Sequence, residues 1–130
     1  MIKGIGTDII DIKRIKRVLI KYDERFKNKC FHKHEILKSD SRYNSAESYA
    51  KRYAAKEACA KALGTGLARG VFWKDIEIRN NTYGKPYIIL HNKAKKYLKN
   101  MNENDFKIEV SISDEKDFAI ANVIIFEWNY

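Results

Sequence analysis

Two residues of one predicted helix, Glu57 and Lys61, have the types and the spacing needed for phosphate chemistry. They lie four positions apart, so a helix places the carboxylate one turn from the ammonium on the same face. A surface ion pair of little energetic value has the same pattern, and spacing alone favours that simpler interpretation. A second carboxylate, Asp8, lies near the end of a predicted strand at the start of the chain.

The three residues together fit a site for Mg²⁺ and a phosphate group. Mg²⁺ usually takes one or two protein carboxylates and completes its shell with water and phosphate oxygens, and Asp8 and Glu57 satisfy that count. Lys61 would set a point charge against the same phosphates. Positioning and charge neutralisation of this kind serve phosphoryl transfer. The spacing does not itself bring Asp8 to Glu57. Asp8 could instead cap the next helix, although Asp11 is the better cap.

The helix that carries Glu57 and Lys61 is predicted over 49–63. Alanine dominates it, strong helix formers fill most other positions, Ser45 or Ser48 is expected to cap its start, and Gly64 suits a left-handed cap at its end. Its alanines recur every four residues and share one face: Ala50, Ala54, Ala58 and Ala62. A stripe of such small side chains lets another backbone approach closely.

The other expected elements together give an α+β fold, with the longest helix packed against the sheet. A glycine-rich segment, Gly64-Thr65-Gly66, is predicted to form a turn, because it follows a helix and the helix dipole there disfavours an anion. The remaining prediction comprises a strand over 2–10, a helix over 12–21, a loop and a short helix around 33–37, strands over 73–79 and 85–90 joined by a hairpin loop, a basic helix from 91 or 92 to about 101, and strands over 106–113 and 118–127.

Length and charge limit what this chain is expected to do. Its 130 residues predict one domain, 1–130, and its net charge of +9 predicts an acidic partner such as nucleic acid, an anionic membrane, a phosphate-rich ligand or an acidic protein. The cations are dense on the amphipathic helix over 12–21, where they repel one another and so favour a binding role. They are Lys13, Arg14, Lys16, Arg17 and Lys21, with Arg25 just beyond.

The sequence predicts neither a disulfide framework nor a membrane span, and it predicts no metal site at the histidines. Cys30 and Cys59 are too few for a disulfide framework, and the apolar run over 118–126 is too short to cross a bilayer, so a cytoplasmic protein is expected. His32 and His34 flank Lys33, but neither a cysteine nor an acid is expected beside them to complete a metal site.

Four motifs, in this order and spacing, resemble those of the holo-[acyl-carrier-protein] synthases, the small members of the 4'-phosphopantetheinyl transferase superfamily. They are GIGTDI over 4–9, KRYAAKEACAKALGTG over 51–66, GKPYI over 84–88 and VSISDEKDFAIANVII over 110–125. An aspartate near the start, followed about fifty residues later by K-E-A-x-x-K on a helix, is far more specific than any one motif. The resemblance implies an antiparallel sheet packed against a long central helix.

The resemblance also implies a reaction and the residues that perform it. A serine of apo acyl carrier protein would attack the β-phosphorus of coenzyme A and take the 4'-phosphopantetheine, 3',5'-ADP would leave, and fatty acid biosynthesis would be supplied. A water on the metal or Glu57 would accept the serine proton. Asp8 and Glu57 match the family's Mg²⁺ ligands, and Lys61 matches its phosphate-contacting catalytic lysine.

Further positions match the binding surfaces of the family. Contacts to coenzyme A are implied for Arg52, for the turn Gly84, Lys85 and Pro86, and for the strand end with Ser111 and Ser113. Arg14 matches a residue that docks the acidic carrier protein, and Lys13, Arg17, Lys21 and Arg25 fit that role by charge. The small members of the family form trimers with active sites between subunits, so a homotrimer is expected.

One position departs from the family pattern. Asp114 stands where the family commonly has histidine, and an acid beside a pyrophosphate would repel it. We therefore expect Asp114 to pair with a cation such as Lys116, or to face solvent, and not to bind the metal. Two other classes of protein compete with the enzyme: a small basic nucleic-acid-binding module, for which no signature motif is present, and an interaction protein without chemistry.

Overall fold

The computed structural model describes residues 1–64, 73–101 and 105–127 of the chain. The expected turn at 65–66 lies outside these residues. In chain order the elements are β1 (Ile2–Asp11), α1 (Ile12–Tyr22), α2 (Glu24–Cys30), α3 (Lys33–Asp40), α4 (Ser45–Leu63), a short 3-10 helix η2 (Trp73–Asp75), β2 (Ile76–Asn80), β3 (Pro86–Leu90), α5 (Asn92–Met101), β4 (Phe106–Asp114) and β5 (Phe118–Glu127).

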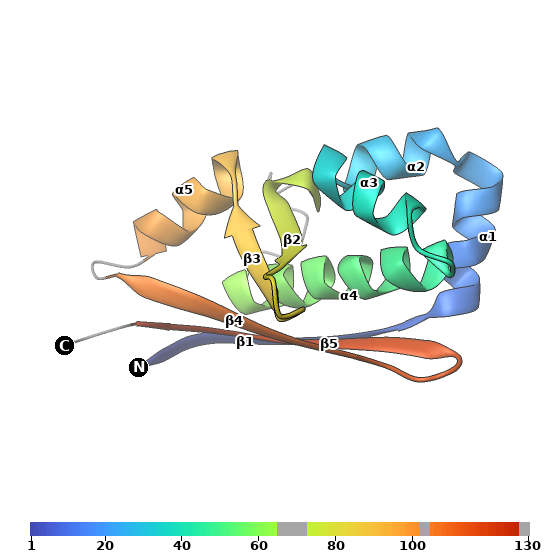
Figure 1. Cartoon of the computed structure of the whole chain (residues 1–130). Helices are drawn as coiled ribbons and strands as arrows, with labels where there is room; N and C mark the ends of the chain where they lie inside the picture. Colours follow the sequence, from blue (N-terminus) through green and yellow to red (C-terminus); the bar gives the residue numbers. More distant parts are fainter. Residues whose placement is uncertain (65–72, 102–104, 128–130) are drawn as a thin grey trace.

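The strands form two antiparallel sheets on opposite sides of α4. The larger sheet has the order β1-β5-β4, and β2 pairs with β3 in a separate hairpin. Helix α4 runs along one face of the larger sheet, and the β2–β3 hairpin, α2 and α3 lie on its other side (Figure 1). The expectation of an α+β fold with its longest helix against the sheet is confirmed.

Two glycines of β1 allow this strand to lie directly on α4. A Cβ atom added to Gly6 would stand 1.7 Å from the backbone oxygen of Ala58, and one added to Gly4 would stand 1.9 Å from that of Ala62. Both alanines belong to the small-residue stripe and are buried. The alanine stripe was predicted to let another backbone approach closely, and here it lets the backbone of β1 contact that of α4. Gly4, Gly6 and Asp8 alternate with exposed residues along β1, so Asp8 faces the helix as well.

Several helix boundaries differ from the expectation. Asp11 caps α1 as expected, accepting the Lys13 N–H at 2.9 Å. Helix α4 begins earlier than predicted, at Ser45, because Asn44 rather than a serine is its cap and accepts the Glu47 N–H at 3.2 Å. Helix α3 begins at Lys33, where His32 and Glu35 form a capping box, and extends to Asp40, beyond the expected end near residue 37.

Two predicted segments were wrong. Helix α2 replaces the expected loop before residue 33; it has only seven residues, too few to show an apolar period. Strand β2 begins at Ile76, and the first part of the predicted strand forms η2.

Candidate active site

The ammonium of Lys61 meets the carboxylate of Asp8 between α4 and β1. Lys61 Nζ lies 3.2 Å from Asp8 Oδ1 and 2.9 Å from the backbone oxygen of Thr7. The Asp8 side chain is only 17% exposed, whereas that of Lys61 is 53% exposed. The close approach allowed by Gly4 and Gly6 therefore brings together two predicted site residues that lie far apart in the sequence.

Glu57 lies one helical turn before Lys61 and is half-buried. Helical side chains lean toward the helix N-terminus, so the lysine chain runs back along the face that carries Glu57. The indole Nε1 of Trp73 donates to Glu57 Oε1 at 3.4 Å. Burial and the charge of Glu57 raise the pKa of Tyr53, one turn earlier on α4, to about 12. Glu57 and Lys61 on this face of α4, together with Asp8 on β1, supply two carboxylates and one cation.

Arg52 occupies a different side of α4 and is almost completely buried, with 7% of its surface exposed. Its Nη1 donates to Ser48 Oγ at 3.1 Å and its Nη2 to Asn80 Oδ1 at 3.2 Å. Its buried Nε has no hydrogen-bond partner among the described residues. Burial lowers the pKa of the guanidinium. A buried cation of this kind, with no carboxylate in contact within the described part of the chain, is a suitable anion-binding group.

The Gly84-Lys85-Pro86 turn is joined to Arg52 through Asn80. The Asn80 amide donates to the Gly84 backbone oxygen at 3.0 Å while its own oxygen accepts from Arg52. Gly84 has φ = 86°, which favours glycine, and Asn81 Oδ1 accepts the Lys85 N–H at 2.9 Å. Arg52 and Gly84 share the wall of an open hollow of about 490 Å³, whose other lining residues include Arg42, Lys51 and Asn80.

The strand end over 111–114 divides between the two faces of β4. Ser111 and Ser113 are exposed and alternate with Val110 and Ile112, which face α4, so within one chain the two serines point away from that helix. Asp114 is on the α4 side, where its Oδ1 lies 2.9 Å from Lys51 Nζ. Asp114 therefore pairs with a cation, as expected, but with Lys51 instead of Lys116.

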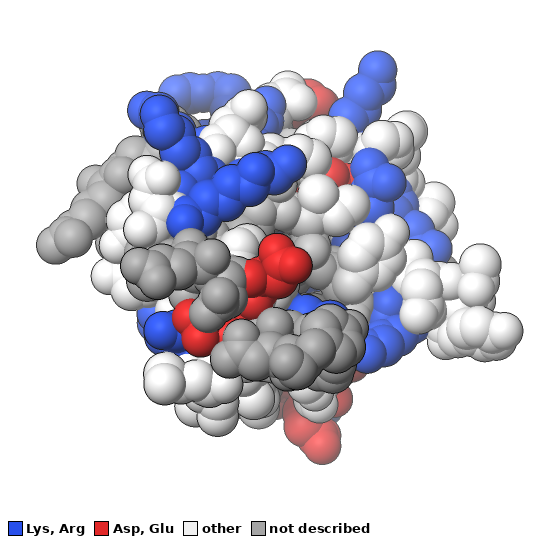
Figure 2. Space-filling model, turned by 90° about the vertical axis from the view of Figure 1, so that its left-hand side faces the viewer, with Lys and Arg blue, Asp and Glu red and all other residues white. Residues whose placement is uncertain are grey.

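The cations of α1, and Arg25 at the start of α2, are all exposed. Lys13, Arg14, Arg17, Lys21 and Arg25 make no ion pair with an acid in the part of the chain that the structure describes. Basic side chains are not confined to α1, however. Figure 2 views the molecule from the end that carries α5, and Lys and Arg side chains spread over that face too. Charge density alone therefore does not single out α1.

Two features near β2 were not predicted from the sequence. Lys56 is fully buried on α4, where its Nζ donates to Glu35 Oε1 at 2.7 Å and also to the backbone oxygens of Trp73 and Ile76. The expectation that no acid lies beside His32 and His34 is wrong, because the carboxylate of Glu77 reaches both from β2. Neither partner is a sequence neighbour, so only the fold reveals them.

Known proteins resemble this chain over almost its whole length. Residues 4–123 match the model of the 4'-phosphopantetheinyl transferase superfamily. A holo-[acyl-carrier-protein] synthase of Sinorhizobium fredii is 50% identical over 125 residues, which cover 96% of this chain and 90% of that protein.

Solved structures of holo-[acyl-carrier-protein] synthases are also similar to this chain. The holo-[acyl-carrier-protein] synthase of Neisseria meningitidis superposes with a TM-score of 0.86 at 35% identity, covering 98% of this chain and all of the other, 100%. The Bacillus anthracis enzyme, solved in complex with coenzyme A (3',5'-ADP), has a TM-score of 0.78 at 35% identity, with 96% of each chain covered. This chain therefore belongs to the 4'-phosphopantetheinyl transferase superfamily, and within it to the holo-[acyl-carrier-protein] synthases.

Proposed function

We propose that this protein transfers 4'-phosphopantetheine from coenzyme A to a serine of apo acyl carrier protein. The contact of Lys61 with Asp8, one helical turn from Glu57, carries this proposal, because it gathers the charged groups that phosphoryl transfer needs. The serine oxygen would form a bond to the β-phosphorus of coenzyme A, and the bond from that phosphorus to the oxygen bridging the two phosphates would break. The 3',5'-ADP would leave with that oxygen.

We infer that Asp8 and Glu57 hold Mg²⁺. The donor set fits this ion, since both groups are half-buried carboxylates and Mg²⁺ prefers hard oxygen ligands. Asp8 has Lys61 as its cation in the described structure, and the exposed lysine chain is free to turn to a phosphate when a metal neutralises Asp8. Bound Mg²⁺ would supply charge neutralisation of the pyrophosphate. Lys61 would then orient the same group as a point charge.

We infer that the phosphates of coenzyme A bind along the hollow that links Arg52 to the Gly84-Lys85-Pro86 turn. Arg52 is a buried cation that lacks a carboxylate partner in the described structure, and Arg42 and Lys51 line the same hollow. Arginine guanidinium groups bind phosphate oxygens through charge-assisted hydrogen bonds. Ser111 and Ser113 point away from α4 within one chain, so any contact from them to coenzyme A would be made from a neighbouring subunit.

We infer that an acidic surface of the carrier protein docks on α1. Arg14 and the neighbouring cations Lys13, Arg17 and Lys21 are exposed and project from α1, whose apolar side is packed, with Ile12 and Ile15 buried. The exposed Arg25 follows at the start of α2. A helix with this charge steers an acidic partner and fixes its orientation.

We further infer a homotrimer built through the open face of the larger sheet. Among the described residues no helix covers the face opposite α4 (Figure 1). Ile5, Ile9 and Ile124 are 63%, 60% and 39% exposed there, an unusual amount of apolar surface for an isolated chain. Association would cover this face and would bring residues of a second subunit toward each site.

The alternative of a nucleic-acid-binding module finds no support among the relatives, which are named as synthases. Among the described helices, none is both long enough and apolar enough to cross a bilayer. Cys30 and Cys59 are buried free thiols, which suits a reducing compartment, and we infer that the single domain 1–130 acts in the cytoplasm.

A mass measurement tests the reaction. The protein is incubated with coenzyme A, Mg²⁺ and an apo acyl carrier protein, and the carrier should gain the mass of one phosphopantetheine while 3',5'-ADP appears in equal amount. Carrier with its acceptor serine changed to alanine should gain nothing, and chelation of Mg²⁺ should stop the reaction. Folded protein that leaves several apo carriers unmodified would contradict the proposed activity.

A further inference from the structure

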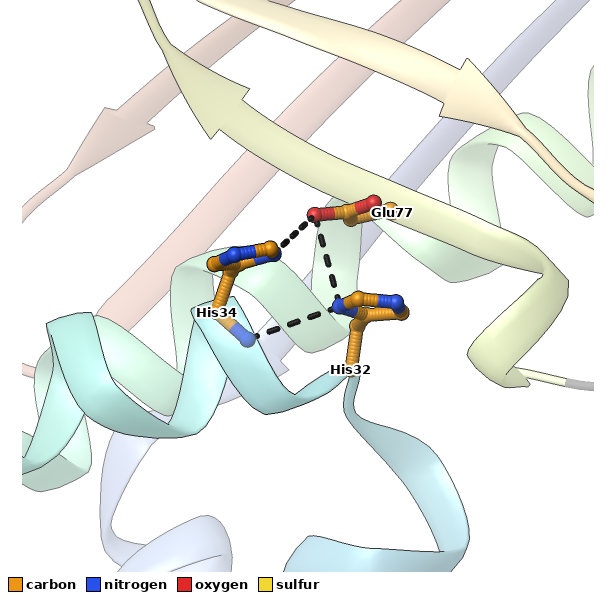
Figure 3. Close-up of side chains that lie close together, drawn as sticks. All are labelled: His32, His34 and Glu77. Atoms are coloured by element: carbon orange, nitrogen blue, oxygen red, sulfur yellow. Dashed lines mark hydrogen bonds and ion pairs between the residues drawn. The ribbon is translucent and has the colours of Figure 1, made fainter.

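All three histidines of the chain converge on one buried carboxylate, that of Glu77. The Nδ1 atoms of His32 and His34 each lie 3.6 Å from Glu77 Oε2, and His91 Nε2 lies 2.8 Å from Glu77 Oε1. The imidazole rings of His32 and His34 are stacked with their centroids 5.2 Å apart, and His91 stacks on the other side of His32 at 5.5 Å. Figure 3 shows the first two histidines, at the start of α3, turned toward Glu77 on β2.

The hydrogen bonds of the two Nδ1 atoms place a donor group against each of them. His32 Nδ1 accepts the backbone N–H of His34 at 3.4 Å, and His34 Nδ1 lies 2.8 Å from Nη2 of Arg79. A backbone N–H and a guanidinium can only donate, so the tautomer that satisfies both contacts has Nδ1 as the acceptor in each histidine. These two nitrogens and the anionic Glu77 Oε2 are all acceptors, so a cation between them is favourable, and in the described structure the Arg79 guanidinium supplies one.

The two nitrogen-to-oxygen separations in this cluster are close to those of a metal site. Zn²⁺ bonds of about 2.0–2.2 Å at tetrahedral angles place neighbouring ligand atoms about 3.3–3.5 Å apart. Here both nitrogen-to-oxygen separations are 3.6 Å, and all three ligand atoms lie within 4.8 Å of one another. His91 orients the carboxylate through its second oxygen, which is the usual role of a group just outside a coordination sphere.

We propose that His32 Nδ1, His34 Nδ1 and Glu77 Oε2 form a second metal site, for a borderline transition-metal ion, Zn²⁺ in the first place, with water as the fourth ligand. Imidazole nitrogens select such ions, whereas the carboxylates Asp8 and Glu57 suit Mg²⁺, so the two sites differ in the ion they take. The bound ion clamps the start of α3 to β2. This site does not depend on the transferase activity.

Arg79 competes with the proposed metal ion for Glu77 Oε2 and His34 Nδ1. Its guanidinium is the cation that serves the cluster in the described structure, because it donates to Glu77 Oε2 and to His34 Nδ1. Its side chain is 36% exposed and borders an open hollow of about 180 Å³ that His34 and Asn80 also line, so it has room to swing away. A purely structural ion pair predicts that loss of Arg79 weakens the cluster, whereas the metal site predicts tighter binding of the ion.

Metal titration of the full chain, without a histidine tag and stripped by a chelator, tests the proposal. Calorimetry should show one Zn²⁺ per chain, and Co²⁺ should give the visible absorption of a tetrahedral site, which Zn²⁺ then removes. His34→Ala should abolish both signals. His32→Asn should do so as well while keeping a helix-capping residue in place. His91→Gln should weaken binding about 10–100-fold, and Arg79→Gln should strengthen it.

Control variants test whether the metal binds at this site and not at other charged residues. Lys33→Ala, between the two ligands, and Asp8→Asn with Glu57→Gln at the Mg²⁺ pair should leave the Co²⁺ spectrum unchanged. Absence of one-to-one binding would overturn the proposal. So would a Co²⁺ spectrum that survives His34→Ala and His32→Asn, or an Arg79→Gln variant that is folded and binds Zn²⁺ no more tightly. If Glu77→Gln fails to fold, the histidine and Arg79 variants still decide the outcome.

Discussion

Asp8 is the residue whose charge most directly links the structure to the reaction. It is mostly buried and has Lys61 as its cation in the described structure. We predict that Asp8→Asn and Glu57→Gln, both nearly isosteric, each lower the transfer rate by at least about 100-fold. Changes just outside a metal's ligands already cost about 10–100-fold, and these are the ligands themselves. Steady-state assays over a Mg²⁺ series measure the loss, and unfolding curves check that the fold is kept. Near-normal turnover at low Mg²⁺ in either variant would reject the metal assignment.

Asp114 holds Lys51 at the edge of the hollow proposed for coenzyme A. Lys51 also pairs with Glu47 at 3.3 Å, so Asp114→Asn removes one of its two carboxylate partners. We predict that this change lowers the KM for coenzyme A by up to about fivefold, because exposed pairs contribute about 0.2–1 kcal/mol. Asp114→His should behave alike. The Mg²⁺ dependence should stay unchanged in both variants. Activity that Asp114→Asn loses at low Mg²⁺ and regains at high Mg²⁺ would show instead that Asp114 binds the metal.

Single residues were predictable from the sequence where the chemistry is local. Asp11 caps α1 because it directly precedes it, and the charges of Glu57 and Lys61 share a helix face by spacing alone. Glu77 was not predictable as a partner of His32, nor Lys51 as the partner of Asp114. Each pair joins segments that are distant in the chain. Apolar periodicity and helix-capping residues, from which the elements were predicted, carry no information about such contacts.

At the scale of elements, β1 and α4 position the site only because two glycines let them touch. We predict that Gly6→Ala destabilises the fold by about 1–3 kcal/mol, as overpacking does, and lowers transfer strongly, since the added Cβ lies 1.7 Å from Ala58 O and pushes Asp8 away from Lys61. Unfolding curves and assays at a temperature where the variant is folded measure the two effects.

Gly64→Ala is the matched control for Gly6→Ala. Gly64 has φ = 79° and open space around an added Cβ, so alanine there should cost about 1–2 kcal/mol through backbone strain alone. This variant should keep its activity. Equal activity of the two variants would mean that the fit of β1 against α4 does not position Asp8.

Helix α1 gives a second prediction at this scale. Arg14→Glu should weaken binding of the acidic carrier and make it less sensitive to salt, while coenzyme A binding stays intact. Lys96→Glu makes the same charge change on α5, where the lysine is also exposed, and should have little effect. Carrier affinity is measured over a salt series for both. A loss of coenzyme A affinity in Arg14→Glu would show that α1 serves the other substrate.

The prediction of elements succeeded where apolar period or composition is strong. The alanine-rich α4 and the hairpin of β4 and β5 lie close to their expected positions. Helix α2 was missed, because seven residues are too short to show an apolar period and its stability comes from the packing of Cys30 and neighbouring Phe31 into the core.

For the molecule as a whole, the open face of the larger sheet predicts association. We expect sedimentation to show a trimer, and Ile5→Glu to convert it to monomers with little transfer activity, because it sets a charge in the apolar face. Tyr83→Glu, at a fully exposed aromatic in the β2–β3 turn, serves as the control and should remain trimeric. A stable, active wild-type monomer at assay concentrations would contradict both the trimer and a shared site. No sequence pattern within one chain specifies this assembly, so the expectation came from the resemblance alone.

The register of β1 also has a consequence for how the protein is made. Its residues pair with β5 across almost the entire chain, so that Thr7 and Asn122, joined by a hydrogen bond, are 115 positions apart. Contacts that close such long loops form slowly, and a ribosome delivers β5 only after all the other strands of this sheet. During synthesis β1 is therefore expected to lack its hydrogen-bonded neighbour until β5 has been made. The site at Asp8 becomes complete only when the last strand arrives, so a nascent chain should have no activity on its carrier until then.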